Sequence, residues 1–319
     1  MPKQYSALLF SLLLAAGLLA MQANALDLNK ALKDAVKDKI EEVKNGGETA
    51  VEKTPEAPPI PVPATPIVTN TSAATSAEAP ANSINWKNPS VDEEIALGRN
   101  ITGSLLGAAP LVKDDALQLY VNKVGRWVAS QSERADLPWK FGVIESADIN
   151  AFAAPGGYVL ITKGLYQKLS NEAQLAGVLG HEIAHVVKKH QLKVLQKQQL
   201  LNTGSSWLKE KFAKNNKLAD KAIGSGAEIS ARSLDKDAEF EADRMGMVLA
   251  TRAGYDAYGL AEVLQTIGQT NKADSSVALL FKTHPAPDER LAKLGDSAGS
   301  KLDNLKAGKT LENRLYKLN

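Results

Sequence analysis

The sequence contains no cysteine, and only four of its 319 residues are histidine. The absence of cysteine excludes disulfide-stabilised scaffolds, zinc ribbons, iron–sulfur clusters, thiol catalysis and lipid attachment through cysteine. A metal ion could therefore be held only by His, Asp or Glu side chains. Blocks of like charge are absent as well, since 38 Lys and Arg residues stand against 36 Asp and Glu residues and the net charge is +2. Because nucleic-acid binders carry clustered basic residues, we expect no nucleic-acid partner.

Residues 1–25 have the pattern of a secretory signal peptide. Lys3 supplies a positive start, residues 7–21 are almost entirely apolar, and residues 23–25 offer small side chains for cleavage. The alternative is a retained membrane anchor, but the apolar run is shorter than the ~20 residues that a spanning helix needs. We therefore expect export to the periplasm, with neither a lipid anchor nor a transmembrane segment in the mature chain.

Two further segments precede the expected folded domain. Apolar residues recur at helical spacing between residues 26 and 44, which indicates a short amphipathic helix. This helix could be solvated, or it could contact a membrane surface or a partner. Residues 45–84 hold half of the 14 prolines among mostly Ala, Thr, Ser, Glu and Val, a composition typical of a disordered linker. We place the compact domain in residues 85–319.

Within this domain, the patterns indicate an α+β fold. Ser90 and Glu93 have the spacing of a capping box and predict the start of a helix. Alternating apolar residues at 139–143 and an apolar run at 158–162 predict two strands, and the sequence looks helical from there to its end. Few strands followed by many helices predict a mostly helical domain with a small β-sheet.

One predicted helix, residues 173–187, carries three ionisable side chains in a largely apolar sequence. Such a helix is buried, and burying His181, Glu182 and His185 costs several kcal/mol unless they are paired or bound to a metal. Residues four apart share a helix face, so both imidazoles can reach one Zn²⁺. Glu182 would flank the ion as general base and acid, taking a proton from water and passing it to the leaving amine. The alternative is a pair of core histidines bonded to carbonyl groups, beside a salt-bridged glutamate.

A catalytic zinc site with two histidines needs a third protein ligand. Position 191, where a metzincin would carry its third histidine, is Gln, and His190 would point away from the metal on a continuous helix, into solvent. A later helix carries Glu239 and Asp243 on one face. We expect Glu239 to be the third ligand and Asp243 to accept the free N–H of His181. The alternative is a solvated acidic face.

Three separated motifs together resemble one known family, the HtpX-like and CAAX-prenyl-protease-like zinc metallopeptidases, in its exported, water-soluble branch. The resemblance implies a zincin-like gluzincin endopeptidase with one Zn²⁺ per chain on His181, His185 and Glu239, and with Glu182 as the catalytic carboxylate. It also implies polypeptide substrates, namely unfolded or misassembled envelope proteins, and a role in protein quality control. The motifs are His181-Glu182-Ile183-Ala184-His185, the pair Glu239 and Asp243, and Thr283-His284-Pro285.

Two further features of the site have open interpretations. His284 precedes a proline and should lie outside regular helix. It could enter the open zinc position and keep the enzyme latent, donate a hydrogen bond to a developing oxyanion as a catalytic group, or be an ordinary loop histidine. The strand with the residues Gly157, Tyr158, Val159 and Leu160 could be a sheet edge that borders the active site and binds an extended substrate, or it could be internal.

The sequence thus predicts a periplasmic zinc endopeptidase. The alternative, from a different functional class, is a periplasmic chaperone or assembly factor whose zinc site is latent or structural. Residues 201–233 separate the two helices that carry the expected ligands and could form a lid.

Overall fold

The computed structural model describes residues 84–203, 234–271, 274–298 and 308–318. The expected signal peptide, the N-terminal helix and all of the linker except its last residue lie outside the described residues, which begin at Ile84. The same holds for residues 204–233 of the possible lid. Among the described helices, none is long and apolar enough to cross a membrane.

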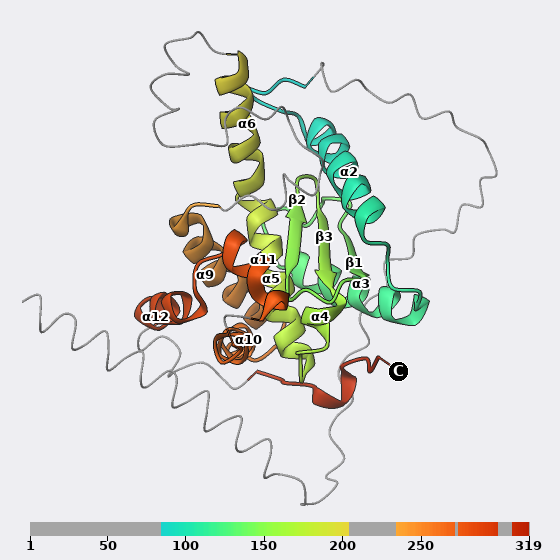
Figure 1. Cartoon of the computed structure of the whole chain (residues 1–319), viewed down its shortest axis with the longest axis vertical. Coiled ribbons are helices and arrows are strands. Elements are labelled where there is room, and N and C mark those ends of the chain that lie inside the picture. Colours follow the sequence, from blue (N-terminus) through green and yellow to red (C-terminus); the bar gives the residue numbers. More distant parts are fainter. Residues whose placement is uncertain (1–83, 204–233, 272–273, 299–307, 319) are drawn as a thin grey trace, which may run out of the picture.

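A three-stranded mixed sheet forms one layer of the domain (Figure 1). Its strands are β1 (Lys140–Ile144), β2 (Ala151–Ala154) and β3 (Tyr158–Thr162), in the spatial order β1-β3-β2. β3 pairs in parallel with β1 and antiparallel with β2. Because both of its sides are paired, β3 is the internal strand and is buried along its whole length.

The sheet topology corrects one expectation. The segment with Gly157, Tyr158, Val159 and Leu160 belongs to the internal strand β3 and its entry turn, so it offers no free edge to a substrate. The strand at the sheet edge beside the candidate site is β2. The sequence did not reveal β2, since it has four residues, three of them alanine, which favours helix and shows no alternation of polar and apolar side chains.

Helices cover the sheet and build the rest of the domain, which confirms the α+β class. α2 begins with the predicted capping box: the Glu93 N–H donates to the Ser90 hydroxyl, and the Glu93 carboxylate accepts from the Ser90 N–H. α3 packs on β1. The helices are α2 (Val91–Ala108), α3 (Asp115–Ala129), α4 (Lys163–Tyr166), α5 (Glu172–Val187), α6 (His190–Thr203), α9 (Lys236–Arg252), α10 (Gly259–Gly268), α11 (Ala278–Thr283) and α12 (Pro287–Ala298).

α5 runs through the middle of the domain, and every one of its residues is buried. It packs against α9, α10, α3 and β2, so helices and the sheet edge surround it (Figure 1). The side chain of Asn171 caps its first turn by accepting from the N–H of Gln174. The apolar sequence around the three ionisable residues therefore predicted the burial of this helix correctly.

The last described segment, residues 308–318, is not helical, contrary to the expectation from sequence. Apart from the 3₁₀ turn Glu312–Arg314, it is irregular and binds the start of α5. The carbonyl of Thr310 accepts from the N–H of Ala173, and Arg314 forms an ion pair with the buried carboxylate of Glu172. This segment gains its stability from contacts with a distant helix end, which a local pattern does not reveal.

Candidate metal centre

Four side chains from three parts of the chain meet beside β2. His181 and His185 extend from α5, Glu239 from the first turn of α9, and His284 directly follows α11. Each offers one nitrogen or oxygen atom, and these four atoms lie within 4.8 Å of one another. The four side chains are at least nine-tenths buried. The structure thus brings together the residues that the sequence singled out as ligands and the histidine whose role was open.

The distances within this cluster suit a single ion. The Nε2 atoms of His181 and His185 lie 2.9 Å apart. The carboxylate of Glu239 is 3.7 Å from Nε2 of His181, 3.6 Å from Nε2 of His185 and 3.8 Å from Nε2 of His284. Ligand atoms ~2.1 Å from a tetrahedral ion are roughly 3.4 Å from one another. The observed spacings lie on both sides of that value.

The chemistry of the donors also fits a zinc ion. Burial raises the pKa of Glu239 well above its ordinary value, and burial lowers the pKa values of His181, His185 and His284. Both carboxylate oxygens of Glu239 are buried without a hydrogen-bond partner among the described residues. A buried polar group without a partner is costly unless a cation or donor compensates it. Neutral imidazoles facing an unpaired carboxylate form a donor set that Zn²⁺ prefers.

The position of His284 follows from the local sequence. Pro285 disfavours helical backbone at the residue before it, so α11 ends at Thr283 and His284 is extended, with φ −128° and ψ 152°. The Nδ1 atom of its ring lies 2.9 Å from the hydroxyl of Thr283. Its Nε2 atom therefore remains to face Glu239.

Asp243 holds the far side of the His181 ring, at the position that the helix spacing predicted. Its carboxylate lies 2.8 Å from Nδ1 of His181. The guanidinium of Arg290, from α12, binds both oxygens of that carboxylate. Burial alone would raise the pKa of Asp243, but Arg290 beside it lowers the pKa below its ordinary value. An ionised Asp243 can then accept the Nδ1–H of His181, which leaves Nε2 free to bind a metal.

The sequence did not predict that Arg290 belongs to the site. This side chain is 4% exposed, whereas arginine is rarely buried without a partner. The residues of α12 that turn inward recur at helical spacing, and an arginine occupies one position of that apolar stripe. A charged residue on the buried face of a helix is the signal that could have identified it. The inward-facing residues are Pro287, Arg290, Leu291, Leu294 and Gly295.

His190 contradicts the expectation that it lies in solvent. It is 4% exposed, and its Nδ1 atom lies 2.9 Å from Nδ1 of His185. The expectation assumed one continuous helix, but α5 ends at Val187 and Lys189 takes a positive φ of 58° before α6 begins. This break turns the His190 ring back toward His185.

Glu182 lies beside the four ligand atoms rather than among them. It is 3% exposed, and burial raises its pKa to about 8, although Arg290 opposes the shift. Together with His185, Glu239 and His284, it lines a cavity bordered by the edge strand β2. The cavity-lining residues of β2 are Ala151, Phe152 and Ala153.

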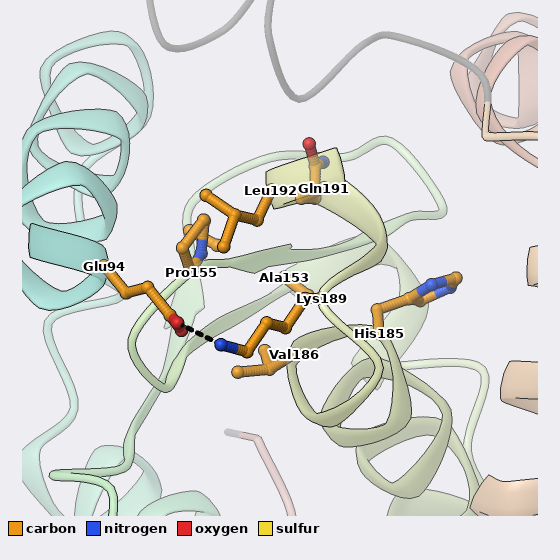
Figure 2. A pocket seen from close by; sticks show the side chains of 9 residues that line it. Glu94, Ala153, Pro155, His185, Val186, Lys189, Gln191 and Leu192 are labelled. Atoms are coloured by element: carbon orange, nitrogen blue, oxygen red, sulfur yellow. Dashed lines mark hydrogen bonds and ion pairs between the residues drawn. The ribbon is translucent and has the colours of Figure 1, made fainter. Parts of the chain in front are cut away.

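Two more cavities adjoin this one, at opposite ends of β2. One shares Ala151, Glu182 and His284 with the central cavity. His181 and Arg290 also line it, and its other side chains are aliphatic. The other shares Ala153, His185 and Gln191 with the central cavity. Lys189 also lines it, and Figure 2 shows this side chain reaching toward α2. The aliphatic residues of the first are Leu165, Val178, Leu260, Val263, Leu264, Ile267 and Leu280.

The chain belongs to peptidase family M48, whose sequence profile matches residues 115–298. All the candidate ligands, Glu182, Asp243 and Arg290 fall inside that match. The family assignment confirms the resemblance that the three sequence motifs indicated.

Individual relatives carry protease names. The chain is 30% identical over 210 residues to the Beta-barrel assembly-enhancing protease of Yersinia pestis, a match that covers 64% of this chain and 43% of the relative. It is 28% identical over 177 residues to the Mitochondrial metalloendopeptidase OMA1 of Schizosaccharomyces pombe, covering 55% and 51%. It is 27% identical over 165 residues to the Metalloprotease YcaL of Escherichia coli strain K12, covering 51% and 63%. The chain thus matches less than two thirds of each of these relatives.

Proposed function

We propose that this protein is a zinc-dependent endopeptidase. The observation that carries the proposal is the buried carboxylate of Glu239, which faces the Nε2 atoms of His181 and His185 and has no hydrogen-bond partner among the described residues. These three side chains would hold one Zn²⁺. When bound, the ion would polarise a peptide carbonyl and make a water molecule acidic enough to lose a proton near neutral pH.

Glu182 is the proton carrier in this proposal. It lines the same cavity as His185, Glu239 and His284 but is not one of the ligands. A pKa raised by burial toward neutral suits a group that accepts a proton from water and then gives it to the leaving amine. The charge of a bound zinc ion would itself change the pKa of Glu182. The proposed role therefore rests on the position of Glu182 beside the ligands.

The substrate would bind as an extended strand along β2. The N–H of Thr162 donates to the carbonyl of Asn150, which sets the phase of the antiparallel ladder. By that phase, Phe152 bonds to β3, while the N–H and C=O groups of Ala151 and Ala153 point to the open side of the sheet. A peptide paired with those groups would lie across the cavity of Glu182. Main-chain pairing of this kind binds many sequences with little side-chain preference.

The aliphatic cavity next to Glu182 would supply what side-chain preference there is. We place this cavity on the amine side of the scissile bond, because it begins at Glu182, which in this proposal protonates the leaving amine. Its walls of Leu, Val and Ile side chains suit a large apolar residue. We therefore expect cleavage before aliphatic or aromatic residues.

His284 would act as a latch. Its Nε2 atom completes a group of four possible ligand atoms within 4.8 Å. A tetrahedral zinc ion with four protein ligands has no open position, as in structural sites, whereas catalysis needs one. Release of His284 would then open the position that a substrate requires.

The cellular role rests on the expected signal peptide and on the name of the Beta-barrel assembly-enhancing protease among the relatives. These support a periplasmic enzyme that degrades unfolded or misassembled envelope proteins. The alternative is a chaperone or assembly factor with a closed zinc site, which the four-ligand cluster would also suit.

Casein cleavage by the protein from residue 26 onward distinguishes the two functions. We expect cleavage that a chelator abolishes and zinc restores. Glu182→Gln should bind zinc normally but cleave nothing, whereas a chaperone would keep its full activity in a test for suppressed aggregation. Glu145→Gln is a suitable control, because Glu145 is exposed and pairs with Lys163. Cleavage by Glu182→Gln at the wild-type rate would refute the peptidase mechanism.

A further inference from the structure

The break between α5 and α6 is strained and firmly anchored. Lys189 takes a φ of 58°, a region that residues other than glycine seldom adopt. Its ammonium group lies 2.6 Å from the carboxylate of Glu94, which is itself 1% exposed and also pairs with Arg134. Figure 2 shows Lys189 reaching Glu94 while His185 projects from another side of the same helix end. The chain thus holds a costly backbone conformation at the residue before His190.

This conformation places His190 between a candidate zinc ligand and a carboxylate. The Nδ1 atoms of His185 and His190 lie 2.9 Å apart, and Nε2 of His190 lies 3.2 Å from the carboxylate of Glu241 on α9. His190 is 4% exposed. Both nitrogens of its ring therefore have a partner.

Only one arrangement of protons lets His185 bind a metal. Its Nε2 atom faces the cluster, so a neutral His185 must carry its proton on Nδ1. That N–H then donates to Nδ1 of His190, which must be unprotonated. The proton of His190 consequently lies on Nε2 and is donated to Glu241. An ionised carboxylate carries no proton, so it serves as an acceptor only. His185, His190 and Glu241 thus form a chain of hydrogen bonds in which each ring donates to the next group, and the carboxylate is the last acceptor.

We propose that His190 is a positioning residue that fixes the tautomer and orientation of His185 for zinc binding, with Glu241 as the final acceptor. The inference rests on the zinc site of the proposed function. The same arrangement is proposed above for the other ligand, where the carboxylate of Asp243 lies 2.8 Å from Nδ1 of His181. Helix α9 would then provide the ligand Glu239 and also both final hydrogen-bond acceptors, Asp243 and Glu241.

The chain through His190 differs from the one through Asp243 in its access to water. The side chain of Glu241 is 42% exposed and lies 3.9 Å from the ammonium group of Lys188, whereas Asp243 is fully buried against Arg290. A partly solvated carboxylate holds its hydrogen-bond donor less rigidly, so loss of Glu241 should have a smaller effect than loss of His190. Partners of this kind typically contribute 10–100-fold to metal affinity.

The test compares variants that differ in the acceptor they offer to His185. His190→Phe keeps a ring but has no acceptor, whereas His190→Asn can place its amide oxygen close to the position of Nδ1. Lys123→Ala, at an exposed position of α3, is the control. Zinc affinity is measured by competition with a chromophoric chelator, and the thermal unfolding of each metal-free protein is measured alongside.

We expect His190→Phe to bind zinc 10–100-fold more weakly, His190→Asn to lose less than about threefold, and Lys123→Ala to match the wild type. Equal losses in the Phe and Asn variants, or wild-type affinity in His190→Phe, would overturn the proposal. If His190→Phe does not fold, the zinc affinity of Glu241→Met decides. A several-fold lower affinity supports the hydrogen-bond chain, and an unchanged affinity refutes it.

A nuclear magnetic resonance spectrum of the ring nitrogens in the zinc-loaded wild type gives a second readout, independent of affinity. His190 should be neutral with its proton on Nε2, and a proton on Nδ1 would refute the proposal. If the wild type binds no zinc at all, the proposed function fails together with the inference. If it binds zinc and cleaves casein while His190→Phe behaves like the wild type, only the inference fails.

Discussion

Gly180 of α5 and Gly246 of α9 lie backbone against backbone. A Cβ atom on Gly180 would stand 2.7 Å from the carbonyl oxygen of Gly246, and one on Gly246 would stand 2.6 Å from the nitrogen of His181. Such distances leave no room for any side chain. The contact is one residue away from His181 in sequence, so it sets how closely the two helices bring Glu239 to the imidazoles.

Gly246→Ala should therefore separate the two helices. Because backbone atoms rather than a flexible side chain meet the new methyl group, we expect a loss of roughly 1–3 kcal/mol in the free energy of unfolding and a weaker zinc affinity. Urea unfolding and chelator competition measure the two effects. Gly103→Ala is the matched control, since a Cβ at this position of α2 meets nothing within 4 Å. This control should be more stable by about 0.5–1 kcal/mol. A Gly246→Ala protein with the stability and affinity of the wild type would contradict the tight helix contact.

Arg290→Met should leave the carboxylate of Asp243 buried without its partner. Breaking a buried pair in this way costs about 3–5 kcal/mol, and a misplaced Asp243 should weaken zinc binding about 10–100-fold. Both values can be measured as for Gly246→Ala. Lys236→Met breaks an exposed ion pair with Glu289 and should change the stability by less than about 0.5 kcal/mol. Similar effects of the two substitutions would show that Arg290 has no special role in the site.

His284→Ala should raise the rate of peptide cleavage, because it frees a fourth position around the metal. The zinc content should remain at one ion per chain, held by His181, His185 and Glu239. Initial rates on a fluorogenic peptide and the metal content of the same sample check both statements. A fall in the rate with zinc retained would instead assign His284 to the oxyanion, and an unchanged rate would exclude both roles.

Pairing of the substrate with β2 predicts a pattern with a period of two. In a peptide that the enzyme cleaves, methylation of a backbone nitrogen removes one N–H. Cleavage should fall sharply when the methyl group is at alternate positions, which pair with Ala151 or Ala153, and little at the positions between them. The intermediate positions serve as the control. A uniform loss along the peptide would contradict strand pairing.

The sequence predicted those parts of the site that one helix determines. The spacing of His181 and His185, and that of Glu239 and Asp243, follows from the helical repeat alone, and the structure places each pair on one face as expected. The burial of α5 followed from its apolar composition. These features depend on residues that are neighbours along the chain.

What the sequence did not predict depends on contacts between distant elements. Arg290 belongs to the site because α12 packs beside α9, and His190 belongs to it because of a positive φ at Lys189. The identity of the edge strand depends on the sheet order, which the pattern of β3 alone does not determine. In each case the local sequence is compatible with an ordinary surface or core position.

The most direct test of the zinc site is the anomalous scattering of a crystal of the purified protein, measured on both sides of the zinc absorption edge. We expect one peak per chain that vanishes below the edge and lies about 2.0–2.2 Å from Nε2 of His181, Nε2 of His185 and a carboxylate oxygen of Glu239. A zinc-replete crystal without a peak between these three side chains, or with a peak elsewhere, would contradict it.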